Sequence, residues 1–237
     1  LQEVISIAED VWGMTPGDLN PGSLDTEVET YLARFDWNIT DDHRAAFRFS
    51  STDQAEAILP GFGNNFFSLS SYWYTQEKVI ETYVGELFSD WTDTFSTELK
   101  VSYRDYQSTP INNSDLPQIR LNFAGALPPG SPAVSSTSAG LVFGTERSRH
   151  FNDLATETWN IYAAGSLFLG DHTLKFGADY DDNTVYNAFL QDTKGNYTFA
   201  CINTSATLTY QFNGGAALTC NTATRDLYGP APRGARS

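Results

Sequence analysis

The stretch Phe95-Ser96-Thr97-Glu98-Leu99-Lys100-Val101-Ser102-Tyr103-Arg104 decides the fold class of this chain. Its odd-numbered positions carry aromatic, aliphatic or threonine side chains, and its even-numbered positions carry polar or charged ones. A β-strand directs successive side chains to opposite faces of a sheet, so this alternation predicts a strand with one apolar and one polar face.

The same alternation recurs on both sides of this stretch, in pairs of segments joined by short polar turns. The turns are Thr40–His43, Asp90–Asp93 and Gly170–His172. Alternating runs flanking short Asp- or Gly-containing turns predict β-hairpins. We therefore expect three hairpins, at about residues 27–53, 73–106 and 154–190.

The connections between these hairpins are long and rich in Pro, Gly and polar residues. They cover about residues 54–72, 107–153 and 191–237, and residues 1–26 also read as a loop. Short turns at one end and long loops at the other are typical of bacterial outer-membrane barrels. The sequence thus predicts an all-β fold: an antiparallel up-and-down transmembrane β-barrel segment of about six to eight strands with long extracellular loops.

The two parities of the strands predict which side chains meet lipid and which meet the barrel interior. The apolar parity predicts a membrane-facing aromatic belt of Tyr31, Phe35, Trp37, Trp91, Phe95 and Trp159. The opposite parity predicts the lumen-facing residues Arg34, Arg48, Lys100 and Arg104. Glu86 would be costly against lipid, so in its strand Tyr83, Gly85 and Leu87 are expected to face outward.

Composition excludes several other classes of protein. The net charge of −15 argues against a nucleic-acid surface, which needs clustered Lys and Arg. The chain contains no run of about 18 apolar residues, which excludes a membrane-spanning helix but not a spanning barrel. The first residues show no signal peptide.

The search for reactive chemistry finds no motif of an enzyme. No nucleophile elbow, phosphate-binding loop or His-Glu-x-x-His helix occurs, so we expect no enzymatic activity, no cofactor and no metal site. Cys201 and Cys220 have no neighbouring His or further Cys, so a disulfide across a polar loop is favoured over a zinc site.

Three segments carry a resemblance to a known family: Arg34–Arg44, Thr82–Asp93 and Gly170–Tyr180. Their strand–turn–strand pattern resembles hairpins of TonB-dependent receptors, and is most similar to the Oar-like subgroup. The resemblance covers about residues 27–200. It implies a barrel of about 22 strands occluded by a plug domain, a periplasmic TonB partner that pulls on the plug, and outer-membrane lipid around the wall.

The sequence departs from the family in showing no plug domain, no TonB box and no terminal aromatic strand. We therefore expect an internal portion of a barrel in the bacterial cell outer membrane, spanning residues 1–237 as one partial domain. The function implied is import of a scarce nutrient, such as a metal chelate, a glycan or a peptide, recognised as an extracellular ligand. Two alternatives stay open: a soluble secreted β-sandwich that binds surfaces, and a passive barrel used for adhesion or anchoring.

Overall fold

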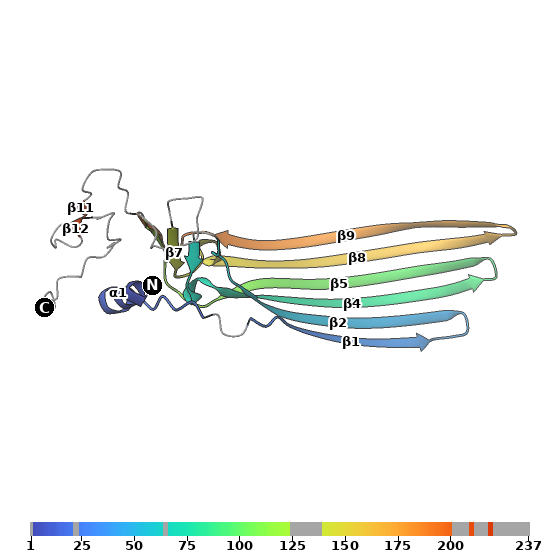
Figure 1. The fold of residues 1–237 in the computed structure, drawn as a ribbon. Coiled ribbons are helices and arrows are strands. Elements are labelled where there is room, and N and C mark those ends of the chain that lie inside the picture. Colours follow the sequence, from blue (N-terminus) through green and yellow to red (C-terminus); the bar gives the residue numbers. More distant parts are fainter. Residues whose placement is uncertain are drawn as a thin grey trace.

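Six long strands form one antiparallel sheet in the computed structural model, which describes residues 2–20, 24–63, 66–123, 139–200, 209–210 and 218–219. Each strand is hydrogen-bonded to its neighbours in the order β1-β2-β4-β5-β8-β9, as Figure 1 shows. The up-and-down antiparallel arrangement predicted from the alternation is therefore confirmed. The strands are β1 (Glu27–Asn38), β2 (His43–Ile58), β4 (Tyr74–Thr92), β5 (Phe95–Asn112), β8 (Phe151–Leu169) and β9 (His172–Leu190).

Tight turns join the strands in pairs at one end of the sheet. In the first turn, the Thr40 hydroxyl oxygen accepts hydrogen bonds from the backbone N–H groups of Asp42 (3.2 Å) and His43 (3.1 Å). In the third turn, Gly170 has a φ of +59°, a conformation that glycine adopts without the steric cost of a side chain. Polar turn residues thus reverse the chain within two to four positions.

The strands run farther from the tight turns than the sequence predicts. β2 continues to Ile58, β5 to Asn112, and β8 begins at Phe151. Each of these extensions pairs with an adjacent strand, as Ile58 does with Tyr74 and Phe151 with Leu190. Ladder pairing between distant segments therefore extends strands into regions whose polar composition reads locally as loop.

The other end of the sheet carries a second structure, which we call the cap (residues 2–20, 59–72, 113–123, 139–150 and 191–200). Its sheet has the order β10-β6-β7-β3, where β6 pairs antiparallel with β7 and parallel with β10. The long connections, expected to be loops, therefore contain strands. The elements of this sheet are β3 (Phe66–Ser68), β6 (Gln118–Phe123), β7 (Ala139–Phe143) and β10 (Asn196–Ala200). Two short strands, β11 (Thr209–Tyr210) and β12 (Leu218–Thr219), pair separately.

Helix α1 (Gln2–Trp12) corrects the expectation of a loop over residues 1–26. Val4, Ile5, Ala8 and Trp12 recur at helical spacing and pack against the cap sheet. Leu69, Ile119, Leu121, Leu141 and Phe143 complete a buried core with Ala8. None of the helices among the described residues is long and apolar enough to cross a membrane.

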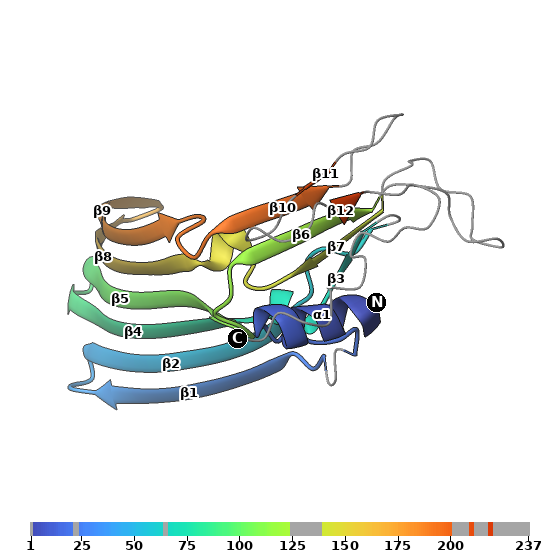
Figure 2. The ribbon, with the colours of Figure 1, turned by 90° about the vertical axis from the view of Figure 1, so that its left-hand side faces the viewer.

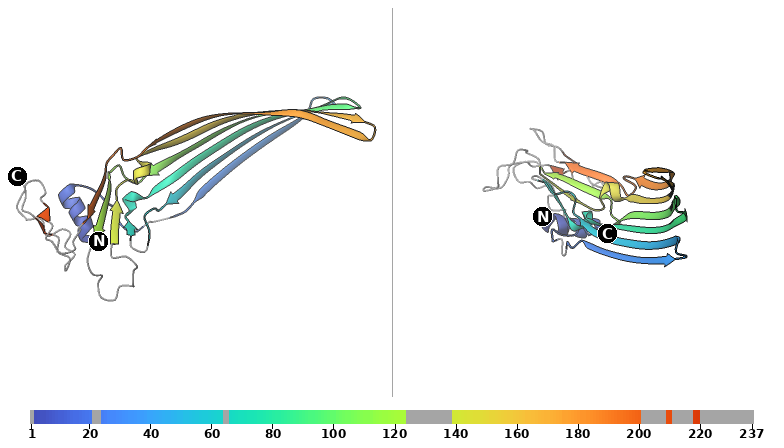
Figure 3. Two further views of the ribbon diagram at one scale, coloured as in Figure 1. Left: turned by 90° about the horizontal axis from the view of Figure 1, so that it is seen from above. Right: turned by 90° about the vertical axis from the view of Figure 1, so that its right-hand side faces the viewer.

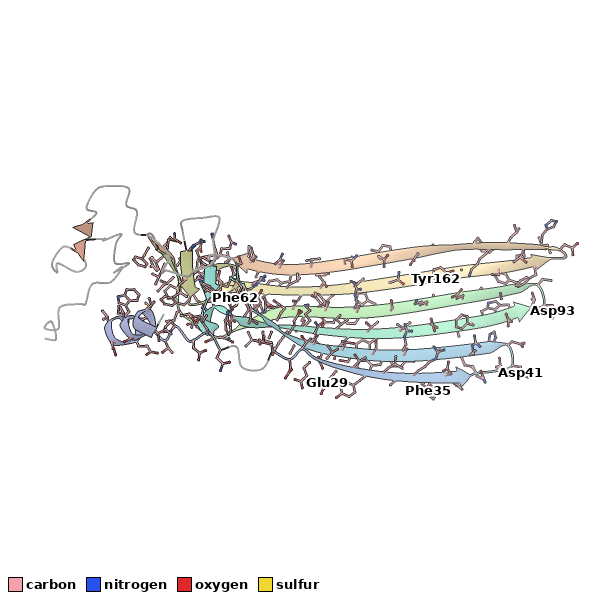
Figure 4. The ribbon with its side chains drawn as sticks, viewed as in Figure 1. Glu29, Phe35, Asp41, Phe62, Asp93 and Tyr162 are labelled. Carbon is pink, nitrogen blue, oxygen red and sulfur yellow. The ribbon has the colours of Figure 1, made fainter. Side chains whose placement is uncertain are left out.

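The six-stranded sheet is curved, and the cap lies on its concave side, as Figures 2 and 3 show. Two short 3-10 helices, η1 (Ser70–Tyr72) and η2 (Arg147–Arg149), lie where the cap meets the sheet. Figure 4 shows Asp41 and Asp93 at the tight-turn end and Phe62 at the cap end. The molecule thus has a long curved wall and a compact unit at one end of it.

Candidate functional site: a two-faced wall and its cap

Cross-strand register divides the side chains of the wall into two faces. Phe35 pairs with Phe47, and the same row continues through Gly85, Val101, Ile161 and Tyr180. Arg34 pairs with Arg48, and that row continues through Val84, Ser102, Asn160 and Asp181. Because side chains alternate along each strand, the two rows define opposite faces of the sheet.

The face that carries Arg34 is the concave one. Tyr74 and Asn112 belong to this face and both contact the cap. The Arg149 guanidinium lies 5.3 Å from the centre of the Tyr74 ring, and the Asn112 side-chain amide donates to the Arg149 carbonyl (2.8 Å). Since the cap is on the concave side, the row of Phe35 and Phe47 lies on the convex face.

The convex face brings together the residues of the predicted aromatic belt. Tyr31, Phe35, Trp37, Phe95 and Trp159 all lie on it. Trp91, at an irregularity between Asp90 and Thr92, lies on the same side: its indole N–H donates to the Thr97 hydroxyl (2.8 Å) and its ring centre is 5.0 Å from that of His43. The six residues do not form one belt, however, because they lie at several levels along the strands.

A row of rings across four strands is an element that the sequence analysis missed. Phe49, Tyr83, Tyr103 and Trp159 are consecutive partners in register, with ring centres 5.0, 6.3 and 4.8 Å apart. Counting residues outward from the tight turn places Tyr83 and Tyr103 at one level, but the stagger between hairpins that adds Phe49 and Trp159 to the row comes only from the strand register. We call this set the aromatic row.

Between the tight turns and the aromatic row, the convex face is apolar and exposed. The exposed fractions of Phe35, Leu99 and Phe176 are 64%, 39% and 59%. A soluble β-sandwich would bury these three side chains between two sheets. Their exposure contradicts the sandwich alternative. On β5 the apolar segment extends from Phe95 to Tyr103, about the 9–11 residues that a tilted strand needs to cross a bilayer.

Beyond the aromatic row, toward the cap, the convex face becomes acidic. Glu81, Asp105 and Glu157 are partners on three adjacent strands, and each lies two residues along its strand from a ring of the aromatic row. The Tyr83 hydroxyl donates to a Glu81 carboxylate oxygen (3.1 Å), which joins the two rows. No Lys or Arg of the six strands lies on the convex face. The chemical character of this face therefore changes abruptly at the aromatic row.

The concave face holds the four cations predicted to face the lumen. Arg34 makes a two-pronged contact with Asp36 (2.9 and 2.8 Å), and Arg104 donates to the Thr158 hydroxyl (3.4 Å). Phe88 and Phe168 also lie on this face. Both stand beside a tight turn in the sequence, as Trp37 does, but Trp37 lies on the convex face. The Arg44 guanidinium lies 4.9 Å from the Phe88 ring centre.

A buried polar cluster joins the separate segments of the cap to one another. The Ser71 hydroxyl donates to the Pro16 carbonyl (2.6 Å) and accepts from the Gly144 N–H (2.9 Å). His150 is 5% exposed; its Nδ1 accepts the Lys194 backbone N–H (3.1 Å), and its Nε2 lies 3.2 Å from the Thr145 carbonyl. These bonds satisfy groups that would be costly to bury unpaired, so they hold the segments of the cap together.

Two titratable groups near this junction are perturbed. Burial raises the pKa of Tyr72 to about 12, and its hydroxyl donates to the Gln118 side-chain carbonyl (3.2 Å). The hydrogen bond and the charge of Lys194 lower the pKa of Asp115, whose side chain is exposed. The Asp115 shift reports an ion pair that stabilises the cap, whereas the Tyr72 shift reports only the burial of its hydroxyl.

The cap contains a hollow of about 310 Å³ beside α1. It is lined by Trp12, Met14, Pro117, Ile119, Tyr197 and Phe199. The rings of Trp12 and Phe199 stack with centres 6.3 Å apart. No group of His, Cys, Asp and Glu with the geometry of a metal site occurs in the part of the chain that the structure describes. Cys201 and Cys220 lie outside the described residues.

Comparison with known proteins agrees with this architecture. No curated protein and no solved structure matches the chain. The sequence model of the family described as outer membrane beta barrel domain matches residues 19–233, which include the whole wall. The long antiparallel strands and their exposed apolar face fit this match, which implies a location in the bacterial outer membrane. The chain belongs to the outer membrane beta barrel domain family.

Proposed function

We propose that the chain forms the barrel wall and the extracellular cap of a TonB-dependent receptor that imports a scarce nutrient, such as a metal chelate, a glycan or a peptide. The observation that carries this proposal is the segregation of the two faces of the wall. One face is apolar over about the length of a membrane-crossing strand, and the other is charged and lies under a folded cap.

In this proposal the convex face contacts outer-membrane lipid. Phe35, Trp37, Trp91, Phe95 and Trp159 are the membrane-facing residues, with the aromatic row at the outer boundary of the hydrocarbon. Tyr31 lies in the row of Ser51 and Glu81, just beyond the aromatic row, and therefore faces the headgroups. Aromatic rings favour the headgroup level, and the carboxylates beyond them favour water. Arg34, Arg48, Lys100 and Arg104 face the interior, which a plug domain of the full-length protein fills and a periplasmic TonB partner acts upon.

The cap supports a receptor over a wall used only for anchoring. It has a core of its own, and it overhangs the concave side at the end away from the tight turns. A solute approaching the interior from this end meets the cap first. The described cap offers a hollow lined by aromatic and apolar residues, and linings of this kind are typical of binding sites for small molecules.

Localisation and energised uptake together test the proposal. Fractionation should place the full-length protein in the outer membrane, extracted only with detergent. Cells lacking the gene should lose growth on a limiting nutrient found by screening chelates, glycans and peptides, and a protonophore should abolish uptake in wild-type cells. Uptake that survives the protonophore would rule out an energised receptor.

A further inference from the structure

We propose that His150 is an acid-sensitive latch inside the cap. At neutral pH its uncharged ring holds the turn of residues 191–195, which leads from β9 to β10. In acid the protonated ring releases this turn and loosens β10 with it. The latch is a conformational switch of the cap, and it operates whichever solute the protein handles.

The two hydrogen-bond partners of His150 fix the protonation state of its ring. A backbone N–H can only donate, so Nδ1, which accepts the Lys194 N–H (3.1 Å), carries no proton. A carbonyl oxygen can only accept, so Nε2, which lies 3.2 Å from the Thr145 carbonyl, carries the proton. The ring is therefore neutral, and a single tautomer satisfies both contacts.

A second proton on this ring would break its contact with Lys194. The proton would sit on Nδ1 and point at the Lys194 N–H, so that two donors would face each other. Because His150 is buried, water cannot replace the lost partner unless the turn moves away. Histidine is the side chain whose charge ordinarily changes between about pH 5 and 8. The released turn accepts the proton more readily than the held one, so a fall in pH favours release.

The charged groups around His150 leave no carboxylate to balance a protonated ring. They come from the segment that contains η2, from the segment before β6 and from the turn after β9, and each carboxylate among them is already paired. The ion pairs are Glu146 with Arg149 (3.9 Å), Asp192 with Arg147 (2.7 Å) and Asp115 with Lys194. The other titratable groups nearby are the phenols of Tyr72 and Tyr74, which carry no charge in acid. Without a free counter-ion, burial disfavours the charged ring.

The turn that His150 holds sets the position of β10. The Gly195 carbonyl accepts the Gln118 N–H (3.0 Å), where the parallel pairing of β10 with β6 begins. β10 is an edge strand of the described cap sheet, so β6 holds it on one side only (Figure 2). β10 also supplies Tyr197 and Phe199 to the hollow beside α1. Release of the turn therefore loosens one side of this hollow.

Hydrogen exchange of the Lys194 amide in the purified full-length protein tests the latch. Its protection factor, which corrects for the intrinsic exchange rate at each pH, should fall about 5- to 30-fold between about pH 7.5 and about pH 5. Asp115 stays ionised over this range, because its pKa is lowered from 3.8. The Leu69 amide, which donates to the Val142 carbonyl (2.9 Å) in the cap core, is the internal reference and should keep its protection.

Two substitutions distinguish the titration of His150 from a general effect of acid. His150→Asn places an oxygen that does not titrate near the position of Nδ1, so the Lys194 protection factor should be the same at both pH values. The control His172→Asn removes an exposed histidine at the third tight turn and should leave the fall unchanged. Heat-shifted electrophoretic mobility verifies folding, and His150→Gln replaces the Asn variant if that variant does not fold. Equal protection of Lys194 at both pH values in the unmutated protein, or an undiminished fall in the folded His150 variant, would overturn the latch.

Discussion

The wall and the cap place large apolar side chains in opposite environments. In the cap, Phe143 and Leu121 are fully buried, whereas in the wall Phe35 and Trp37 are 64% and 55% exposed. The cap therefore buries its apolar surface within the protein, as a soluble unit does. The convex face leaves its large apolar side chains exposed, and under the proposed function hydrocarbon covers them. One chain thus combines a cap whose core is buried from water with a wall whose apolar face suits hydrocarbon.

The largest expected effect tests the independence of the cap core. Phe143→Ala removes a fully buried ring and should lower the local unfolding free energy of β6 and β7 by about 3–5 kcal/mol. Hydrogen exchange of the β6 and β7 amides in the outer-membrane protein measures this. The control Phe35→Ala, on the convex face, should leave that exchange unchanged. If both substitutions accelerate it equally, the cap does not have a separate core.

The second effect distinguishes the two faces of the wall directly. Val101→Arg places a cation within the convex apolar segment, between its middle at Leu99 and its end at Tyr103, and should cost up to about 2–4 kcal/mol of folding free energy in a bilayer. Ser102→Arg, its neighbour on the concave face, should cost much less. Denaturant titration of folding into lipid vesicles measures both. Equal losses would show that the convex face is not the one in contact with lipid.

A smaller effect concerns the aromatic row. The rings of Tyr103 and Trp159 are 4.8 Å apart, and a double-mutant cycle with Ala should give a coupling energy of about 0.5–1.5 kcal/mol. The pair Tyr83 and Tyr103, at 6.3 Å, should couple more weakly. The same titration provides the energies. Zero coupling for the closer pair would mean that the rings act only as individual interface anchors.

The smallest effect is a pH dependence confined to the cap. The ion pair with Lys194 lowers the pKa of Asp115 from its ordinary value of 3.8. A carboxyl whose pKa is lower in the folded state stabilises that state above pH 3.8 and loses the contribution as the pH falls through the lowered pKa. The protection factor of the Gly195 amide, which corrects hydrogen exchange for the intrinsic rate at each pH, should therefore fall in acid below pH 3.8, though only slightly because Asp115 is exposed, and Asp115→Asn should remove this dependence.

The wall could be predicted from the sequence more fully than the cap. The wall follows from alternation within single strands, because Phe95 to Arg104 specifies both faces without reference to any other segment. Turn residues such as Gly170 then fix the pairing of neighbouring strands. Counting outward from a turn gives the level of each side chain within one hairpin, but the stagger between hairpins that completes the aromatic row is set by pairing between strands distant in sequence.

The cap could not be predicted in the same way. β6 pairs in parallel with β10, and the paired residues Gln118 and Asn196 are 78 positions apart in the sequence. No local pattern encodes such a contact. Its strands are also short, and Pro, Gly and Asn around them favour a loop by composition alone. Only α1 had a usable signal, because Val4, Ala8 and Trp12 repeat at helical spacing.

The length of the strands has a consequence for what surrounds the protein on a cell. β5 has 18 residues, about 60 Å of strand at about 3.3 Å each, and its apolar part ends at Tyr103. In the orientation of the proposed function, the remaining half extends beyond the hydrocarbon to the cell exterior even when the strands are tilted. Strand residues such as Asp105 and Glu157, and not only loop tips, are therefore within reach of antibodies, phage and impermeant labels applied to intact bacteria.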